Sequence, residues 1–291
     1  MKSSKTVLIV GLGYAGLAVA SRALATGYRV IATTRRHGGA SFGPGIEIVS
    51  FYDARPYAVA THLVVTAPPS ADGDPVWGCH AKSLHAAQAL RWVGYISTTG
   101  VYGHRDGGWV GEATLPAPGL ERSRRRLAAE RQWSVLASRA AVAIFRTGGI
   151  YGPGRSVLDD VRSSIARAVS RPGHAFSRIH RDDIARAVIA AEGRISSAGR
   201  VVFHLVDDEP AEAAAVTRYA AQLLHATAPP DVPFEVAFKT MSEMGRSFWS
   251  ENRRVSNLRT KSYLGIEWAY PTFREGLRAI LAEERGENAA K

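Results

Sequence analysis

The feature that most constrains the fold of this chain is a glycine-rich turn that joins an apolar strand to a helix. Thr6–Val10 is a short run rich in β-branched residues, the pattern of a strand buried on both faces. It leads into Gly11-Leu-Gly-Tyr-Ala-Gly16, and apolar residues then recur at helical spacing until Gly27. Because Arg29–Thr33 has the pattern of the next strand, the segment predicts a βαβ unit of about thirty residues.

Each glycine of this turn has a separate physical role in a dinucleotide-binding site. Gly11 permits the tight turn, Gly13 lets the backbone approach a pyrophosphate, and Gly16 allows the helix to pack closely on the strand. The helix that begins with Tyr14 and Ala15 offers unpaired N–H groups and a partial positive charge to phosphates. We therefore predict a dinucleotide at these residues. The alternative is a glycine-rich turn that holds no ligand.

The end of the second strand predicts which dinucleotide is bound. An NAD site usually places Asp or Glu there, about 20 residues past the glycines, to bind the ribose 2′-hydroxyl. This chain has Thr33, Thr34, Arg35 and Arg36 instead, and Thr hydroxyls with an Arg fork would bind a 2′-phosphate that a carboxylate would repel. The residues favour NADP, with NAD possible. The alternative is that both arginines point into solvent.

Alternating strand and helix patterns continue along the chain and predict an α/β fold, a Rossmann-type doubly wound parallel sheet. Further strands are expected at Ile46–Val49, His62–Thr66, Trp92–Ser97, Ala141–Phe145 and Val201–Leu205. Helices are expected at His80–Leu90, Arg122–Leu136, Leu158–Val169, Asp182–Ala191, Ala211–His225 and Thr272–Glu284. The alternation loosens after residue 150. We therefore expect an NAD(P)-binding domain over 1–150, and over 151–291 a mixed region that completes the sheet and forms a smaller C-terminal substrate lobe.

Together these patterns resemble the extended short-chain dehydrogenases/reductases, the NAD-dependent epimerase/dehydratase family. The resemblance covers nearly the whole chain. It is carried by Gly11–Gly16, Tyr95–Gly103, Phe145–Gly154, Ile179–Ala185, Leu264-Gly-Ile and Phe273–Leu277. It implies an NADP-binding oxidoreductase or epimerase of atypical type, acting on a small polar substrate such as a sugar nucleotide.

In that family a Ser or Thr at a strand end hydrogen-bonds the reacting oxygen. The matching residue here is Thr98, whose hydroxyl could polarise a carbonyl as an oxyanion donor does. The alternative is that this hydroxyl and its neighbours only satisfy local backbone groups.

The family's acid/base pair, a Tyr followed four residues later by Lys, is absent from this chain. Arg122 stands at the Tyr position and Arg126 at the Lys position. Arg126 could still reach ribose hydroxyls. Arg122 cannot replace a phenol, because guanidinium keeps its proton near neutral pH, but it could clamp an anion or stabilise an oxyanion. This departure favours a second interpretation, a non-catalytic NADP-binding redox sensor or regulatory module.

Without that tyrosine, a redox enzyme must take its proton from another group. Tyr102 is the first candidate and Tyr151 the second, although each could be a half-buried ring with a tied hydroxyl.

The resemblance also places Thr66, Ala67 and Pro68 along the cofactor groove and Asp53 near the adenine, where a plain loop Asp is the alternative. The group His180, Asp182 and Asp183 looks like a metal triplet. We interpret it instead as a strand end followed by a helix N-cap at Asp182 or Asp183, and we expect no metal site.

The net charge of +11 raises the question of a nucleic-acid partner. The densest basic run, Arg122–Arg131, has only Trp133 as an aromatic neighbour and matches no reading motif, so we expect none. The single Cys79 cannot form an internal disulfide, and no apolar run reaches the ~18 residues of a membrane helix. The apolar N-terminal stretch could imitate a secretory signal, but the strand and glycine turn explain it better. We expect a cytoplasmic monomer or homodimer that binds a small-molecule substrate and no membrane.

Overall fold

The computed structural model describes residues 5–34 and 42–286. Within these residues the centre of the molecule is a parallel sheet of seven strands in the order β11-β7-β5-β4-β1-β2-β3. The order changes direction at β1, as in doubly wound nucleotide-binding sheets, and the predicted fold class is confirmed. The strands are β1 (Thr6–Val10), β2 (Arg29–Thr33), β3 (Ile46–Val49), β4 (His62–Val65), β5 (Trp92–Thr98), β7 (Ala141–Thr147) and β11 (Gly199–Leu205).

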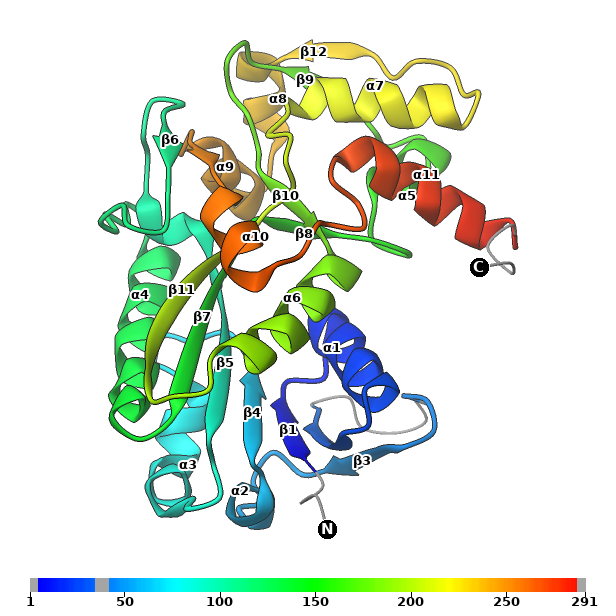
Figure 1. Ribbon diagram of the computed structural model, residues 1–291. Helices are drawn as coiled ribbons and strands as arrows, with labels where there is room; N and C mark the ends of the chain where they lie inside the picture. The colour runs from blue at the N-terminus through cyan, green and yellow to red at the C-terminus, as the bar shows by residue number, and fades with distance from the viewer. Residues whose placement is uncertain (1–4, 35–41, 287–291) are drawn as a thin grey trace.

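Helices cover both faces of the sheet (Figure 1). Because successive strand residues point to opposite faces, Val7 and Ile9 pack on one side of β1, and Leu8 and Val10 pack on the other. The first side is covered by α1 (Tyr14–Ala25) and α6 (Arg181–Arg194), and the second by α2 (Arg55–Val59), α3 (Pro75–Ala86) and α4 (Glu121–Ser134). Strands buried on both faces explain the continuous apolar runs of the sequence.

The remaining elements form a smaller lobe and its connections to the sheet (Figure 1). Two 3-10 helices, η1 (Thr99–Tyr102) and η2 (Val135–Ser138), follow β5 and α4. Three short parallel ribbons pair β8 (Gly149–Tyr151) with β10 (Arg178–His180), β9 (Ala168–Ser170) with β12 (Asp231–Pro233), and β6 (Trp109–Val110) with β13 (Arg254–Val255). The other helices are α5 (Val157–Arg162), α7 (Ala213–Leu223), α8 (Phe234–Thr240), α9 (Glu243–Trp249), α10 (Leu258–Leu264) and α11 (Phe273–Glu284).

Two helix boundaries differ from the sequence prediction by five residues or more. The helix expected over Leu158–Val169 ends at Arg162, because Ser164 adopts a left-handed φ of 56° and the chain then forms β9. The helix expected from His80 begins at Pro75 instead, where the Asp74 carboxylate caps the first turn. The dipeptide Asp74-Pro75 is an N-terminal helix signal that the apolar periodicity had hidden.

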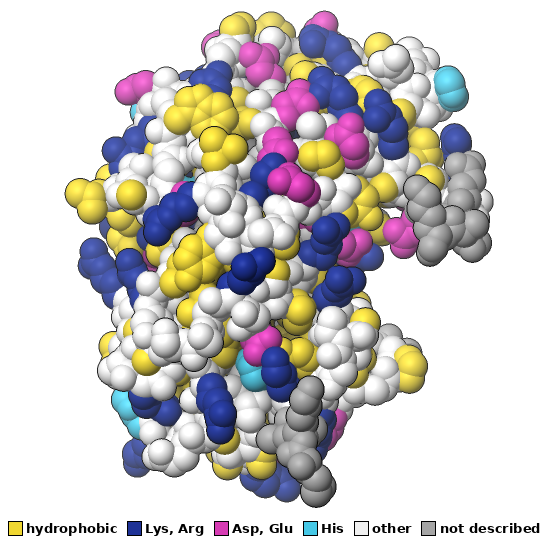
Figure 2. All heavy atoms as spheres, viewed as in Figure 1, with side chains coloured by type: hydrophobic (Ala, Val, Ile, Leu, Met, Phe, Trp, Pro, Cys, Tyr) yellow, Lys and Arg dark blue, Asp and Glu magenta, His cyan; other side chains and the backbone are white. Residues whose placement is uncertain are grey.

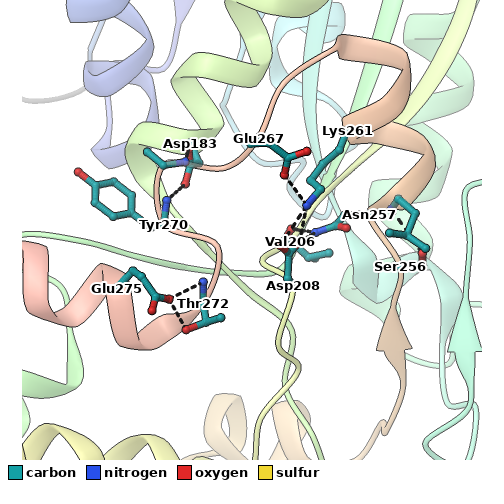
Figure 3. A network of polar contacts seen from close by, with 12 residues as sticks. Asp183, Val206, Asp208, Ser256, Asn257, Lys261, Glu267, Tyr270, Thr272 and Glu275 are labelled. Carbon is teal, nitrogen blue, oxygen red and sulfur yellow. Dashed lines mark hydrogen bonds and ion pairs between the residues drawn. The ribbon is translucent and has the colours of Figure 1, made fainter.

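The N-cap predicted at Asp182 or Asp183 is wrong. The cap of α6 is His180, whose Nδ1 accepts from the Asp182 N–H at 3.3 Å. The buried Asp183 carboxylate instead accepts the backbone N–H groups of Ala269 and Tyr270 at 2.8 and 2.9 Å (Figure 3). It thereby ties α6 to the chain that leads into α11. In the described residues no three His, Cys, Asp or Glu side chains are grouped to hold a metal.

The same part of the structure holds the end of β11 in place (Figure 3). Asn257 Nδ2 donates to the Val206 carbonyl at 2.8 Å and to Asp208 Oδ1 at 2.7 Å. Lys261 Nζ lies 3.0 Å from Asp208 Oδ2 and 2.8 Å from Glu267 Oε2. These contacts fasten the C-terminal chain to the carboxyl end of the sheet. Every helix in 5–34 and 42–286 is too short or too polar to cross a bilayer. Figure 2 shows Lys and Arg side chains spread over the viewed face of the molecule, among acidic and apolar ones.

A buried ion pair joins α4 to the sheet. Arg146 of β7 donates to both carboxylate oxygens of Glu130, at 3.0 and 2.7 Å, and both side chains are buried. Ser97 Oγ of β5 donates to the same carboxylate at 2.5 Å. Arg146 Nη1 also donates to the Tyr102 hydroxyl at 2.7 Å, so each of the three guanidinium nitrogens has an acceptor.

We expect Glu130→Ala to lower the free energy of unfolding by about 3–5 kcal/mol, because it leaves a buried guanidinium without its counter-charge. Urea unfolding followed by circular dichroism measures the loss. The matched control is Glu47→Ala, which removes an exposed ion pair with Arg29 and costs at most about 1 kcal/mol. Equal losses in the two variants would contradict the assignment.

Candidate functional site

The glycine turn after β1 is fixed by hydrogen bonds from two neighbouring strands. Gly11 has a φ of 102°, which favours glycine, and its carbonyl accepts from both the Gly13 N–H at 2.7 Å and the Thr66 hydroxyl. Leu12 N–H donates to the Thr33 carbonyl at 2.7 Å. Thr66 therefore acts in the turn itself, between the ends of β1 and β4.

The three glycines meet different surroundings. A Cβ at Gly11 would lie 2.7 Å from Thr66 Oγ1 and 2.9 Å from the Ala67 nitrogen, and a Cβ at Gly16 would overlap the Gly11 carbonyl. A Cβ at Gly13 would meet nothing within 4 Å. The first turn of α1 carries no acidic residue. Open space beside free helix N–H groups, without a carboxylate to repel an anion, fits a dinucleotide pyrophosphate.

The other residues expected around the cofactor are only partly brought together. Tyr14 and Ala15 begin α1, and Ala67 and Pro68 follow β4 beside the glycine turn. Thr34 follows β2 directly, and Arg35 and Arg36 lie outside the described residues. The Asp53 carboxylate already forms an ion pair with its neighbour, because it accepts hydrogen bonds from the Arg55 guanidinium at 2.7–3.2 Å. This guanidinium lowers the pKa of Asp53 to about 2.

A second site is a cavity of about 540 Å³ at the carboxyl ends of β5 and β7. Three predicted catalytic residues, Thr98, Arg122 and Arg126, line it together. The lobe supplies the opposite wall through Phe176, Arg178, Phe248, Trp249, Glu251 and Arg253. The fourth predicted residue, Tyr102, is absent from this lining.

Arginines dominate the charge of the cavity. Arg122 donates to Met244 Sδ, and Arg126 donates to the Tyr95 hydroxyl and the Ile96 carbonyl. Arg178 donates to two backbone carbonyls. None of these three has a carboxylate within 4 Å in the described part of the chain. Burial lowers the pKa of Arg122 and of Arg178, although Glu251 and Asp207 respectively attract them from farther away and offset part of this effect. Only Arg253 is paired, with Glu251 Oε2 at 2.8 Å. Unpaired guanidinium groups around a cavity favour an anionic ligand.

The Thr98 hydroxyl has a structural role and still retains a proton to donate. Its oxygen accepts from the Gly100 N–H at 3.1 Å and caps η1. A hydroxyl that accepts one hydrogen bond can donate another, and Thr98 lines the cavity. The residue can therefore polarise a substrate oxygen without leaving its cap.

Neither tyrosine considered as a proton donor lines the cavity. Tyr102 is fully buried, and its hydroxyl is bonded to His204 Nε2 at 2.5 Å and to Arg146. Tyr151 is buried against Gly276, and its hydroxyl lies 3.5 Å from the Thr272 carbonyl. Burial raises the pKa of both phenols. In this structure both rings are part of the framework around the site.

Sequence reasoning missed the lobe residues of the cavity. Arg178 had one available signal, a charged residue within the strand-like stretch that precedes Ile179 and His180. Glu251 and Arg253 follow α9 in irregular chain, where no periodicity or motif marks them. Their place in the site depends on the pairing of β13 with β6, a contact between segments about 145 residues apart.

The molecule is therefore an α/β protein with a nucleotide-type glycine turn and an arginine-lined cavity, both at the carboxyl ends of the strands of its central sheet. No protein-family model matches the chain. A conserved Silicibacter pomeroyi protein of unknown function is 39% identical, with a TM-score of 0.86 over 96% of this chain and 99% of that one. A Methylobacillus flagellatus protein assigned by its name to the NAD-dependent epimerases/dehydratases is 25% identical, with a TM-score of 0.73 over 97% and 100%.

Two further matches have lower identity or coverage. MoeE5, in complex with UDP-glucuronic acid and NAD, has the same fold at 20% identity, with a TM-score of 0.74 over 96% of this chain and 99% of that one. A 3-diazoavenalumate denitrifying reductase of a Streptomyces species is 29% identical over 168 residues, 56% of this chain. That match spans 54% of the reductase, about half its length. Over nearly its whole length the chain is thus similar to a protein named as an NAD-dependent epimerase/dehydratase, in agreement with the family that the sequence motifs resemble.

The different surroundings of the glycines give a test of the dinucleotide site. We expect Gly13→Ala to leave the unfolding temperature nearly unchanged, because its Cβ meets no protein atom. The same substitution should weaken dinucleotide binding at least tenfold, because the Cβ occupies the space that the pyrophosphate needs. Gly16→Ala should instead destabilise the fold by more than about 1 kcal/mol, because its Cβ overlaps the Gly11 carbonyl. Thermal unfolding and fluorescence titration with NADPH measure the two effects. Unchanged binding in Gly13→Ala would contradict the site.

Proposed function

We propose that this chain is an NADP-dependent oxidoreductase or epimerase of atypical type that acts on a small anionic substrate. The observation that carries the proposal is the cavity at the carboxyl ends of β5 and β7, where Thr98 lies among four arginines. In doubly wound sheets, ligands bind outside the carboxyl ends of the strands near the change in strand order. Here the glycine turn and the cavity occupy the same side of the sheet.

The proposed cofactor is a nicotinamide dinucleotide, which supplies the hydride chemistry when bound. The open space at Gly13 and the acid-free first turn of α1 support binding of its pyrophosphate. The NAD held by MoeE5, a protein of the same fold, supports this class of cofactor. A preference for NADP rests on the sequence after β2, where Thr34, Arg35 and Arg36 stand in place of an acid.

The proposed substrate carries at least one negative charge. Arg122 and Arg178 line the cavity without a carboxylate within 4 Å in the described chain, and an anion could form a direct ion pair with both. Phe248 and Trp249 add apolar surface beside them. A sugar nucleotide, the class of ligand in the MoeE5 complex, has the required charge and remains the substrate class we propose.

The cavity residues have separate proposed roles. Thr98 donates a hydrogen bond to the reacting oxygen, and Arg122 clamps the anionic group of the substrate. Arg126 is held at the cavity wall by the Tyr95 hydroxyl and the Ile96 carbonyl, and its proposed role is to contact the ribose hydroxyls of the cofactor. Tyr102 acts indirectly, because its hydroxyl holds Arg146 beneath the cavity.

A regulatory NADP-binding module is the second candidate. It is favoured by the two guanidinium groups that replace the family's tyrosine and lysine, since neither can exchange a proton near neutral pH. Such a module would keep the glycine turn and lose turnover. The two candidates therefore share their cofactor prediction and differ in hydride transfer.

Cofactor binding and hydride transfer test the proposal together. We expect NADPH to bind at least tenfold more tightly than NADH in fluorescence titrations, because only NADPH presents a 2′-phosphate. We also expect hydride exchange between bound NADPH and a member of a panel of carbonyl compounds and nucleotide sugars that includes UDP-glucuronic acid. Equal affinities would remove the NADP preference. Tight binding with complete inertness, together with a ligand-dependent change in assembly, would support the regulatory module.

The role of Thr98 has its own test. Thr98→Val removes the hydroxyl at nearly constant volume, so we expect turnover to fall by 10²–10³-fold while the affinity for NADPH stays the same. Thr98→Ser, which restores the hydroxyl, should recover much of the rate. If Thr98→Val turns over at the normal rate, the residue serves only as the cap of η1.

A further inference from the structure

Tyr14, the first residue of α1, is held by a turn from the second half of the chain. Its hydroxyl donates to the Pro153 carbonyl at 3.0 Å. The turn runs from Gly152 to Arg155, whose backbones bond each other at 3.0 and 3.2 Å, with Gly154 at a φ of 69°. Pro at the second position and a left-handed Gly at the third are typical of a type II turn. The chemistry of this turn therefore sets Arg155 beside the glycine-rich loop.

A second arginine reaches the same ring from α6. The parallel pairing of β8 with β10 brings Arg181 next to Gly152, where a Cβ would lie 3.1 Å from Arg181 Cγ and 2.6 Å from the Tyr14 hydroxyl. The guanidinium carbons of Arg181 and Arg155 lie 5.0 and 5.5 Å from the centre of the Tyr14 ring. Both cations thus converge on the residue that begins α1.

Two cations held against one ring make this end of α1 electropositive. Like charges repel, and Arg181 also occupies the N-terminus of α6, the end of a helix where a cation is destabilised. The Tyr14 ring offsets part of the cost through cation–π contact. Asp182 Oδ1 lies 3.4 Å from Arg181 Nε and compensates that arginine in part, whereas Arg155 has no carboxylate within 4 Å in the described chain. The first turn of α1 supplies no acid either.

We infer that Arg155 and Arg181 bind the pyrophosphate of the dinucleotide, as two side-chain cations that supplement the backbone N–H groups of α1. The inference rests on the proposed function, because it requires a dinucleotide at the glycine turn. It adds residues outside the glycine motif and outside the sequence predictions. It also gives the Gly152–Arg155 turn a role. The turn positions a positively charged side chain from the second half of the chain beside the dinucleotide site in the first half.

Binding measurements test this inference without any turnover. We expect Arg155→Ala and Arg181→Ala each to weaken NADPH and NADH about equally, by roughly tenfold, because both cofactors contain the pyrophosphate. The double variant should also show a smaller dependence of Kd on salt concentration. Arg155→Lys should recover part of the affinity. The matched control is Arg200→Ala, which removes one exposed positive charge at the start of β11, the opposite end of the sheet.

The outcomes separate this inference from the proposed function. Unchanged Kd values in both single variants and the double variant, with normal binding by the wild type, overturn the pyrophosphate role alone. A loss confined to NADPH also overturns it, because the arginines would then contact the 2′-phosphate. Failure of the wild type to bind either cofactor overturns the proposed function and this inference together. Thermal unfolding checks that each variant is folded, and the exposed Arg155 carries the test alone if Arg181→Ala does not fold.

Discussion

The buried pair of Glu130 and Arg146 is the interaction on which the geometry of the cavity depends. It joins α4 to β7, and Ser97 connects the same carboxylate to β5. Through the Tyr102 hydroxyl the network continues to His204 of β11, whose Nδ1 bonds the Ser256 carbonyl at 2.7 Å. Because neither charge is tolerable inside the protein without the other, α4 cannot shift relative to the strand ends. The face of α4 that carries Arg122 and Arg126 is therefore held in a fixed position over the site.

Local patterns in the sequence were enough to predict the sheet and the glycine turn. Buried strands such as Thr6–Val10 are continuous apolar runs bounded by turn residues, and the structure has that strand at the predicted bounds. The prediction that Thr98, Arg122 and Arg126 share one region also depended on local motifs, and all three line one cavity. Arg178, Glu251 and Arg253 could not be assigned in this way. They reach the cavity through pairings between distant segments, which leave no periodicity in the sequence. The prediction of the α6 N-cap failed for a related reason, since the Asp183 carboxylate accepts a hydrogen bond from a backbone N–H about 87 residues away.

In the alignment that the sequence motifs imply, two guanidinium groups stand where the family has a phenol and an ammonium group. A tyrosine beside a lysine is suited to moving a proton, because the neighbouring cation lowers the pKa of the phenol. Arg122 and Arg126 keep their protons at any ordinary pH and present fixed forks of N–H donors. The guanidinium carbon of Arg122 also lies 4.4 Å from the centre of the Phe248 ring, a cation–π contact that helps to hold the side chain at the cavity. Under the proposed function, the cavity therefore holds and orients a charged substrate. Thr98 contributes a hydroxyl to its lining at the end of β5.

The pairing of β11 with β7 has a consequence for how the chain can be divided. All seven residues of β7 are buried, and each is matched by a residue of β11, a strand that lies some fifty residues beyond position 150. A fragment that ended near that position would keep β7 but expose its unpaired N–H and C=O groups along an apolar strand. Such an edge is a template for association with other chains. The first half of the molecule thus contains the nucleotide-type turn, but it needs β11 from the second half to cover the edge of β7 and prevent aggregation.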